Sequence, residues 1–383
     1  MLAALACQPA DHTPCSFMLF KGLHARSRSY LEFLEAQIAL GLDTFVQLPP
    51  RPPQASNDTY NLHGLPVSHD PRVRVTEWKE NLPGEDLPIL VKEYHTPAGS
   101  LRAEVRQTRD WPRGDHIPLF DDFIEPRSRK FLVETVSDLE ALRYLLVAPS
   151  EDEIQKYRAD SHPCLEFAQQ KKLLVAGGWG VGADGIGWLS GLMNMIKLTH
   201  TQPEFIRALL DQIATWNRSR MQVVLSTGVD LYIKRAWYEN CDFWTPTTWI
   251  KFIQPILKEE VSLAHQNGAK FGYILTSSGM HLIEPIIQAG VDVLIGVDPK
   301  EYDLRRTAEL ADDRLCLWGG VNGHLTVERG TPDQVAQEVE SSLDILGDQP
   351  GFILSPVDNI RELSPAIEEN IRALITTWQS KIR

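Results

Sequence analysis

Two hydrophobic patterns alternate along the chain from residue 172 onward. Short apolar runs, rich in β-branched residues, are separated by longer stretches in which apolar residues recur with the 3.6-residue period of a helix. The short runs are almost continuously apolar, which is typical of parallel strands covered on both faces. We predict six such strands, at 173–176, 231–233, 271–275, 291–297, 315–318 and 352–354.

The longer stretches predict helices that follow these strands. Thr331-Pro332 and Ser364-Pro365 each pair an N-cap residue with proline at the first helical position. Gly268 and Gly290 stand where helices should end. The predicted helices cover residues 203–224, 246–267, 279–289, 301–311, 332–346 and 364–380.

Two further strands fit upstream, at 16–20 and 44–48, with a helix over 27–40 between them. Eight strands that alternate with helices are the number that closes an α/β barrel. The chain therefore predicts a (β/α)₈ TIM barrel in one domain, residues 1–383. A doubly wound open sheet is the alternative.

Residues 50–135 interrupt this rhythm. A proline-rich start is followed by two alternating runs, 89–94 and 100–108, on either side of Pro97-Ala98-Gly99. This pattern predicts an antiparallel hairpin, inserted after the second strand. We expect the insertion to cover the carboxyl-terminal mouth of the barrel and to shape a pocket there.

The net charge and the cysteine content indicate which kinds of partner and which cellular compartment are expected. The chain has 38 Lys and Arg against 51 Asp and Glu, a formal net charge of −13, and no basic tract. This argues against nucleic acid and against an electrostatic membrane contact. No apolar run approaches the ~18 residues of a membrane span. Five scattered cysteines without a CxxC pair favour a reducing, cytoplasmic location.

Candidate chemistry lies where barrel loops converge, at the carboxyl ends of the strands. We predict Glu239, Asp298 and Asp358 as the catalytic carboxylates. Strand alternation should turn only one of Lys234 and Arg235 inward, and the sequence does not say which. The predicted substrate-binding residues are Gln47, Trp179, Lys234, Arg235, Tyr238, Thr276, Ser278, Asn322, His324 and Asn359.

Residues 180–185 match the GxGxxG pattern and follow a predicted strand. A dinucleotide fold also needs an acidic residue at the end of a second strand about 20 residues later. The next predicted strand begins only near residue 230. We therefore interpret the glycines as a loop that approaches a ligand closely, not as a dinucleotide site.

Several segments together resemble the uroporphyrinogen decarboxylase superfamily, which includes the corrinoid-linked methyltransferases. The resemblance covers most of the chain and is best over residues 170–380. It implies a (β/α)₈ barrel, and by analogy a homodimer. The segments that carry it are 96–101, 237–246, 264–270, 289–294, 319–322 and 352–356, with Glu369-Asn370 near the end.

The chain departs from both activities of that superfamily. Methyltransferases that activate a thiol carry His-x-Cys-Gly on strand five and a cysteine after strand eight, which bind zinc. This chain has Thr276-Ser277-Ser278-Gly279 and Pro356-Val357-Asp358-Asn359 in these places, so we predict no metal. The Gly-His-Gly and the arginine-rich amino-terminal segment of the decarboxylase are also missing; the latter region holds only Lys21, His24, Arg26 and Arg28.

Three hypotheses remain. The first is metal-independent acid–base decarboxylation of a small carboxylate or tetrapyrrole-type substrate, with Glu239 or Asp298 as the acid and Lys234 or Arg235 on a substrate carboxylate. The second is methyl transfer between a small methylated substrate and a corrinoid protein, with zinc or corrinoid as cofactor and a metal at Glu239, Asp298 or Asp358. The third is a barrel that binds a tetrapyrrole or corrinoid without turnover.

Overall fold

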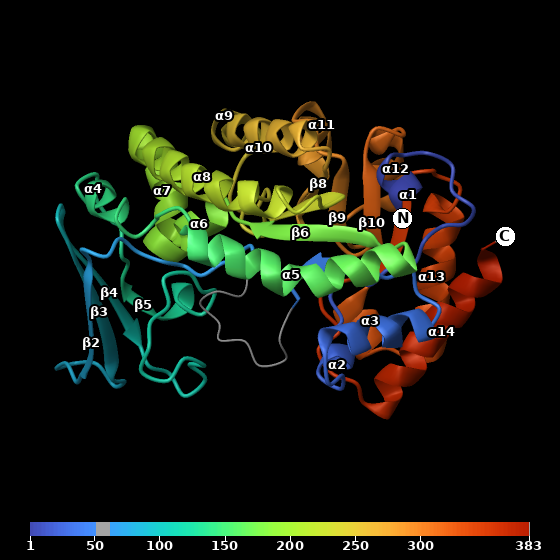
Figure 1. The fold of residues 1–383 in the computed structure, drawn as a ribbon, viewed down its shortest axis with the longest axis horizontal. Coiled ribbons are helices and arrows are strands. Elements are labelled where there is room, and N and C mark those ends of the chain that lie inside the picture. Colours follow the sequence, from blue (N-terminus) through green and yellow to red (C-terminus); the bar gives the residue numbers. More distant parts are fainter. Residues whose placement is uncertain (51–61, 383) are drawn as a thin grey trace.

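A curled parallel sheet of seven strands forms the centre of the molecule. The computed structural model describes residues 1–50 and 62–382 (Figure 1). The strand order β1-β6-β7-β8-β9-β10-β11 follows the chain, and neighbouring strands pair in parallel. The strands are β1 (Phe45–Leu48), β6 (Leu174–Gly180), β7 (Leu231–Arg235), β8 (Lys270–Ile274), β9 (Val293–Val297), β10 (Cys316–Asn322) and β11 (Phe352–Val357).

These seven strands agree with seven of the eight predicted strands. Nearly all their residues are buried because side chains on both faces are covered. One face of the strands packs into an inner cluster that contains Phe45, Ile233 and Ile295. The other face packs against the surrounding helices through residues such as Tyr232 and Phe271.

The predicted first strand, residues 16–20, is not a strand of this sheet. It contacts β11 through two isolated parallel bridges, Cys15 to Leu354 and Leu19 to Asn359. Between them, the backbone N–H of Met18 donates to the hydroxyl of Ser355, not to a backbone carbonyl, which interrupts the ladder. The structure therefore shows a TIM-like curled sheet, and a closed ring of eight strands is not shown.

The predicted helices are present beside the sheet, with two differences, and three further helices over residues 151–201 lie outside the predicted ranges. The stretch 246–267 forms two helices, and the second has Pro255 near its start; the stretch 279–289 begins with a 3₁₀ turn, Met280–Leu282. The other described helices along these strands are α3 (Tyr30–Ala39), α5 (Glu151–Lys171), α6 (Ala183–Ser190), α7 (Leu192–Thr201), α8 (Pro203–Leu225), α9 (Pro246–Phe252), α10 (Gln254–Gln266), α11 (Ile283–Gln288), α12 (Leu304–Ala311), α13 (Pro332–Leu346) and α14 (Pro365–Lys381).

The insertion forms an antiparallel sheet of its own in the order β2-β3-β4-β5. Its central pair, β3 (Ile89–Thr96) and β4 (Gly99–Arg106), confirms the predicted hairpin. The outer strands β2 (Arg74–Glu80) and β5 (Ser128–Lys130), and α4 (Asp138–Leu142), were not predicted. The proline-rich start of the insertion lies almost wholly outside the described residues.

The two ends of the central sheet are covered by different parts of the chain. The inserted sheet and the short helix α1 (Leu2–Leu5) lie at opposite ends of the molecule in Figure 1. Ala4 and Leu5 of α1 belong to the inner cluster, beside Cys316 at the start of β10. Asp122 of the insertion instead reaches Arg235, at the carboxyl end of β7. A second short helix, α2 (Lys21–His24), follows the residue 15–19 segment.

Candidate active site

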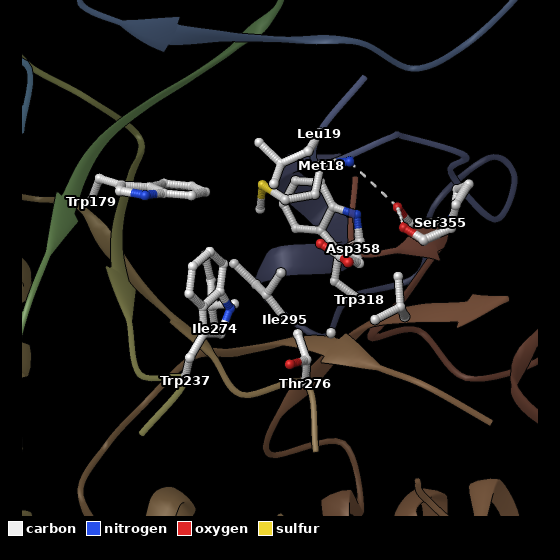
Figure 2. Close-up of a pocket in the computed structure, with 13 residues that line it drawn as sticks. Met18, Leu19, Trp179, Trp237, Ile274, Thr276, Ile295, Trp318, Ser355 and Asp358 are labelled. Carbon is white, nitrogen blue, oxygen red and sulfur yellow. Dashed lines mark hydrogen bonds between the residues drawn. The ribbon is translucent and has the colours of Figure 1, made fainter. Parts of the chain in front are cut away.

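An aromatic cavity opens at the carboxyl-terminal side of the central sheet. Its wall, shown in Figure 2, comes from the six strands β6 to β11 or the turns that follow them, and from the segment next to β11. It encloses about 380 Å³ of space, part of which is open to solvent. The lining residues are Met18, Leu19, Trp179, Trp237, Ile274, Thr276, Ile295, Gly296, Trp318, Ser355, Pro356, Val357 and Asp358.

Trp179 reaches the cavity because β6 contains a bulge. Gly178 pairs with Ile233 and Gly180 pairs with Lys234, so Trp179 is the extra residue between two consecutive partners on β7. Its φ is +80°, a left-handed value that a tryptophan rarely adopts. A bulge redirects one side chain, and a backbone outlier of this kind is found most often at functional sites.

Trp318 lies at a second irregularity. The pairing of β10 with β9 shifts register between Trp318 and Gly319. Gly319 and Gly320 then take φ values of +157° and +99°. A side chain on Gly319 would approach the backbone of Val297 to 2.4 Å, so only glycine allows the two strands to come this close here. Two of the three cavity tryptophans are thus held by glycine-dependent distortions.

Asp358 is the carboxylate in the wall. It follows β11, has a φ of +70°, and has a 45 % exposed side chain. Arg361, itself half exposed, donates to its carboxylate at 2.9 Å. Exposed pairs of this kind contribute little energy and can separate, so Asp358 is available to a ligand. Among the described residues that line the cavity there is no lysine, arginine or histidine.

Arg235 stacks on Trp237, one of the residues that line the cavity. Its guanidinium carbon is 4.0 Å from the ring centre of Trp237 and 4.7 Å from that of Trp188. Its Nε donates to Asp184 at 2.8 Å, and its Nη2 donates to Asp122 at 3.2 Å. Arg235 is therefore the inward member of the Lys234–Arg235 pair, but it is buried, and its Nε and Nη2 bind protein carboxylates.

Asp184 and Asp122 both hold this arginine. Asp184 also accepts the backbone N–H of Tyr238 at 2.8 Å, and Asp122 accepts Tyr238 Oη at 3.0 Å and Trp188 Nε1 at 2.9 Å. Burial raises the pKa of Asp184, although the nearby guanidinium of Arg235 opposes this shift. The insertion is thus tied to the end of β7 through Asp122.

Lys234 points away from the cavity, into a buried network between the sheet and the helices. Its Nζ donates to Glu260 of α10 at 2.7 Å and lies 3.8 Å from Glu239. Burial alone would lower the pKa of Lys234, but the two carboxylates raise it. Glu239 also accepts the backbone N–H of Ala183 at 2.8 Å and the hydroxyl of Tyr273.

This network explains the glycine-rich loop. The N–H of Val181 donates to Asn217 at 2.9 Å, and the N–H of Ala183 donates to Glu239. A side chain on Gly182 would collide with Glu239 at 2.0 Å. The glycines therefore permit close packing onto buried protein side chains, which makes these two amides unavailable to a phosphate.

Asp298 lies at the end of β9 with Asn322 as its partner. Asn322 Nδ2 donates to it at 2.7 Å, and the N–H of Lys300 donates at 2.9 Å. Burial raises the pKa of Asp298. Neither Asp298 nor Glu239 is among the described residues that line the cavity, so the three predicted carboxylates do not share one wall.

The remaining predicted residues lie around the mouth. Gln47 lies two positions after Phe45 and so shares its inward face. Ser278 donates to Asp242 at 2.7 Å, and His324 pairs with Glu328 at 3.1 Å. Asn359 accepts the N–H of Lys21. Of all the predicted site residues, Trp179, Thr276 and Asp358 line the cavity together.

Sequence reasoning missed most of the aromatic wall. Trp237, Trp318 and Met18 were not proposed, although Trp318 stands in Trp318-Gly319-Gly320 much as Trp179 stands beside Gly178 and Gly180. A tryptophan flanked by glycines at a strand end was the available signal. Among the described residues, no group of three or more His, Cys, Asp or Glu could hold a metal ion. The prediction of no metal stays a prediction.

With this geometry in view, the chain can be compared with known proteins. The family model for uroporphyrinogen decarboxylase (URO-D) matches residues 175–380, more than half of the chain. The chain belongs to the URO-D family. No curated protein matches it in sequence. No helix of the described residues has the length and apolar character to cross a membrane.

Two solved structures are similar to the chain over most of its length, and one of them shares its fold with a TM-score above 0.5. A methyltransferase from Methanosarcina mazei superposes with a TM-score of 0.58 at 16% identity, over 99% of this chain and 97% of that one. A B12-independent methionine synthase from Shewanella sp. W3-18-1, in complex with selenomethionine, has a TM-score of 0.44 at 10% identity, over 96% and 97%. At these identities the likeness concerns the fold alone.

Proposed function

We propose that this URO-D family protein is an enzyme that transfers a methyl group from a small substrate held in the tryptophan-lined cavity. One observation carries the proposal: the described wall offers three indoles, two hydroxyls and one carboxylate, but no cation. A substrate with several carboxylates needs fixed cations to replace its water, because buried unpaired charges are costly. The described part of the wall therefore favours a small methylated substrate over a polycarboxylate.

The size of the cavity supports a small substrate. The space of about 380 Å³ includes a part that is open to solvent, so the enclosed part is smaller. This weighs against a large ring such as a tetrapyrrole or corrin held inside, either as substrate or as a ligand without turnover. A corrinoid would have to be presented from outside by a partner protein, and we assign no residue to it.

A homodimer, and the closure of the ring by residues 14–20, remain part of the proposal.

The residues of the chain would bind and orient the substrate. Trp179 and Trp237 line the space that would take apolar groups, and the fully buried Trp318 packs behind it, while Thr276 and Asp358 offer oxygen atoms for the polar end. Arg235 keeps Trp237 in place by stacking on it. Proximity of this kind lowers the entropic part of the barrier to transfer.

Acid–base decarboxylation is the second candidate because Asp298 has a raised pKa, as a proton donor requires.

One experiment distinguishes methyl transfer from decarboxylation. The purified chain is incubated with small methylated amines, ethers and thioethers, with free reduced cobalamin as acceptor, and loss of the methyl signal is followed by NMR. Release of CO₂ from carboxylated pyrroles is measured in parallel.

We expect methyl loss without CO₂ release. Replacing Trp318 with leucine should reduce the rate at least tenfold, because the cavity loses an aromatic wall. Trp78→Leu, in the inserted sheet, is the matched control and should not change the rate. Release of CO₂ without methyl transfer would contradict the proposal and favour decarboxylation through Asp298.

A further inference from the structure

The inserted sheet has two edges of different kinds. At one edge, β5 (Ser128–Lys130) is three residues long, and its pairing with β4 shifts register between Glu104 and Val105. At the other edge, β2 (Arg74–Glu80) is seven residues long, contains no proline, and pairs with β3 over its whole length without a shift. Short strands, prolines and bulges are ways in which proteins keep a sheet edge from pairing with another chain. The edge at β5 has such features, and the edge at β2 does not.

The outer side of β2 is open to solvent in the described part of the chain. Among the described strands β2 pairs with β3 alone, and it lies at the outer end of the molecule in Figure 1. Residues 74–79 are all exposed, including the large apolar side chains of Val75 and Trp78, which are 37 % and 36 % exposed. A row of unpaired backbone N–H and C=O groups is a template for a further strand. β2 is therefore an edge to which another strand can be added.

The sequence of β2 is complementary to itself. In an antiparallel pair, opposite residues are of the same hydrogen-bonding type, so two copies of one strand must meet about an axis through a residue. With the axis at Trp78, Glu77 lies opposite Lys79 of the second copy, and Trp78 lies opposite its own copy. Opposite charges and aromatic pairs in such positions stabilise a sheet, whereas like charges destabilise it. An axis at Glu77 would place two glutamates opposite one another.

The charges that this pairing needs are accessible at the edge. The Lys79 side chain is 45 % exposed, and its Nζ lies 3.8 Å from Asp115, which is itself exposed. An exposed pair of this kind contributes little energy, so Lys79 can turn to another carboxylate. The carboxylate oxygens of Glu77 lie 3.0 Å from Lys92 Nζ and from His116 Nδ1. These contacts hold Glu77 on the face of the sheet that Lys79 of the second copy would share.

We propose that β2 pairs antiparallel with β2 of a second copy of this chain, so that the two inserted sheets form one continuous sheet with its two-fold axis at Trp78. This rests on the homodimer that is part of the proposed function, and it gives that homodimer an interface. The pairing closes on itself because each copy presents the same strand to the other. It joins few residues, so the interface is small and the dimer should dissociate on dilution.

The first test measures the mass of the full chain by analytical ultracentrifugation over a range of concentrations. We expect an equilibrium between monomer and dimer. Lys79→Glu places like charges opposite one another on both sides of the axis, so it should raise the dissociation constant about fivefold or more. Lys156→Glu makes the same change at an exposed lysine of α5 and should leave the dissociation constant unchanged.

The second test examines the register by cross-linking. Opposite residues have Cβ atoms about 4.5–5.5 Å apart, so Trp78→Cys should form a disulfide-linked dimer with oxidised glutathione. Thr76 lies opposite Glu80 of the second copy, and its own copy is roughly 13 Å further along the strand. Thr76→Cys should therefore give no linked dimer, and it also controls for the five native cysteines.

The outcomes separate the interface from the rest of the proposal. A dimer that is unaffected by Lys79→Glu would overturn this interface and leave the homodimer in place. Cross-linking at position 76, or at neither position, would overturn the register. A chain that is monomeric at every concentration would overturn the interface and the homodimer together. Methyl transfer is judged separately, by the assay described above, because the described cavity wall takes no residue from the inserted sheet.

Discussion

Two adjacent residues, Lys234 and Arg235, show how polar groups of this chain come to have structural roles. Lys234 and Arg235 are adjacent in sequence, yet one enters a buried network behind the sheet and the other stacks on a cavity tryptophan. Sequence alone predicted that they would diverge, because alternate strand residues face opposite sides. It did not give the direction, which depends on Glu260 and Asp184, two partners distant in the chain.

Removing Lys234 should destabilise the protein. Lys234→Met leaves Glu260 and Glu239 buried without their cation, and breaking one side of a buried pair costs about 3–5 kcal/mol. Urea unfolding measures the loss. Lys381→Met removes a partly exposed lysine 3.5 Å from Asp344 and should cost no more than about 1 kcal/mol. Equal effects for the two variants would argue against the buried network.

The stability of the folded protein should depend on pH through Asp298, and the direction of this dependence follows from its pKa. Burial raises the pKa of Asp298 in the folded protein above its ordinary value of 3.8. Between these two pKa values the folded protein keeps a proton on Asp298 that the unfolded chain has lost. Its contribution to stability therefore falls as pH rises from the ordinary value of 3.8 towards the raised folded value. Asp298→Asn should remove this fall, so its melting temperature relative to wild type should increase through that window. A difference that is constant with pH would contradict the assignment.

At the scale of elements, the local hydrophobic pattern predicted those strands whose two faces are both covered. The apolar runs of β7, β8 and β9 stand out in the sequence because water reaches neither side. β2 was missed because it is an exposed edge strand whose residues show no apolar alternation. The bulge at Trp179 was also beyond prediction, since it depends on how β6 and β7 align.

The bulge itself can be tested through its glycine. A side chain on Gly178 would lie 2.5 Å from the carbonyl oxygen of Ile233, so Gly178→Ala must displace backbone and with it Trp179. Gly228 also has a positive φ (+77°, against +116° for Gly178), but a side chain on it would meet nothing within 4 Å. Gly228→Ala should therefore cost only the ~1–2 kcal/mol of a left-handed residue. We expect Gly178→Ala to cost more and to alter the near-UV circular dichroism of tryptophan. Identical effects would show that β6 tolerates a side chain there.

At the scale of the whole molecule, sequence resemblance indicated the family, and hydrophobic periodicity predicted the repeated strand–helix order. The URO-D match confirms the family. It did not place the cavity, because the wall is assembled from residues as distant as Met18 and Asp358. The predicted site was a ring of strand-end polar residues. Most of these residues are occupied by helix caps, buried ion pairs or one another, and the cavity is chiefly aromatic.

Long-range packing at the amino terminus is also testable. Leu5 is 1 % exposed in the inner cluster, whereas Leu2 of the same short helix is 58 % exposed. Leu5→Ala should cost about 2–5 kcal/mol of unfolding free energy because it leaves a void in that cluster. Leu2→Ala should stay within about 0.5 kcal/mol. Equal denaturant midpoints for the two variants would show that α1 is not packed as described.

The position of α1 has a kinetic consequence. Ala4 and Leu5 cover the inner cluster at the amino-terminal end of the strands, and the cavity lies towards the other end. Whatever enters must then leave by the same entrance. If the proposed methyl transfer takes place there, a demethylated product that has not left would obstruct the next substrate molecule. Steady-state assays should then find product inhibition that is competitive with substrate.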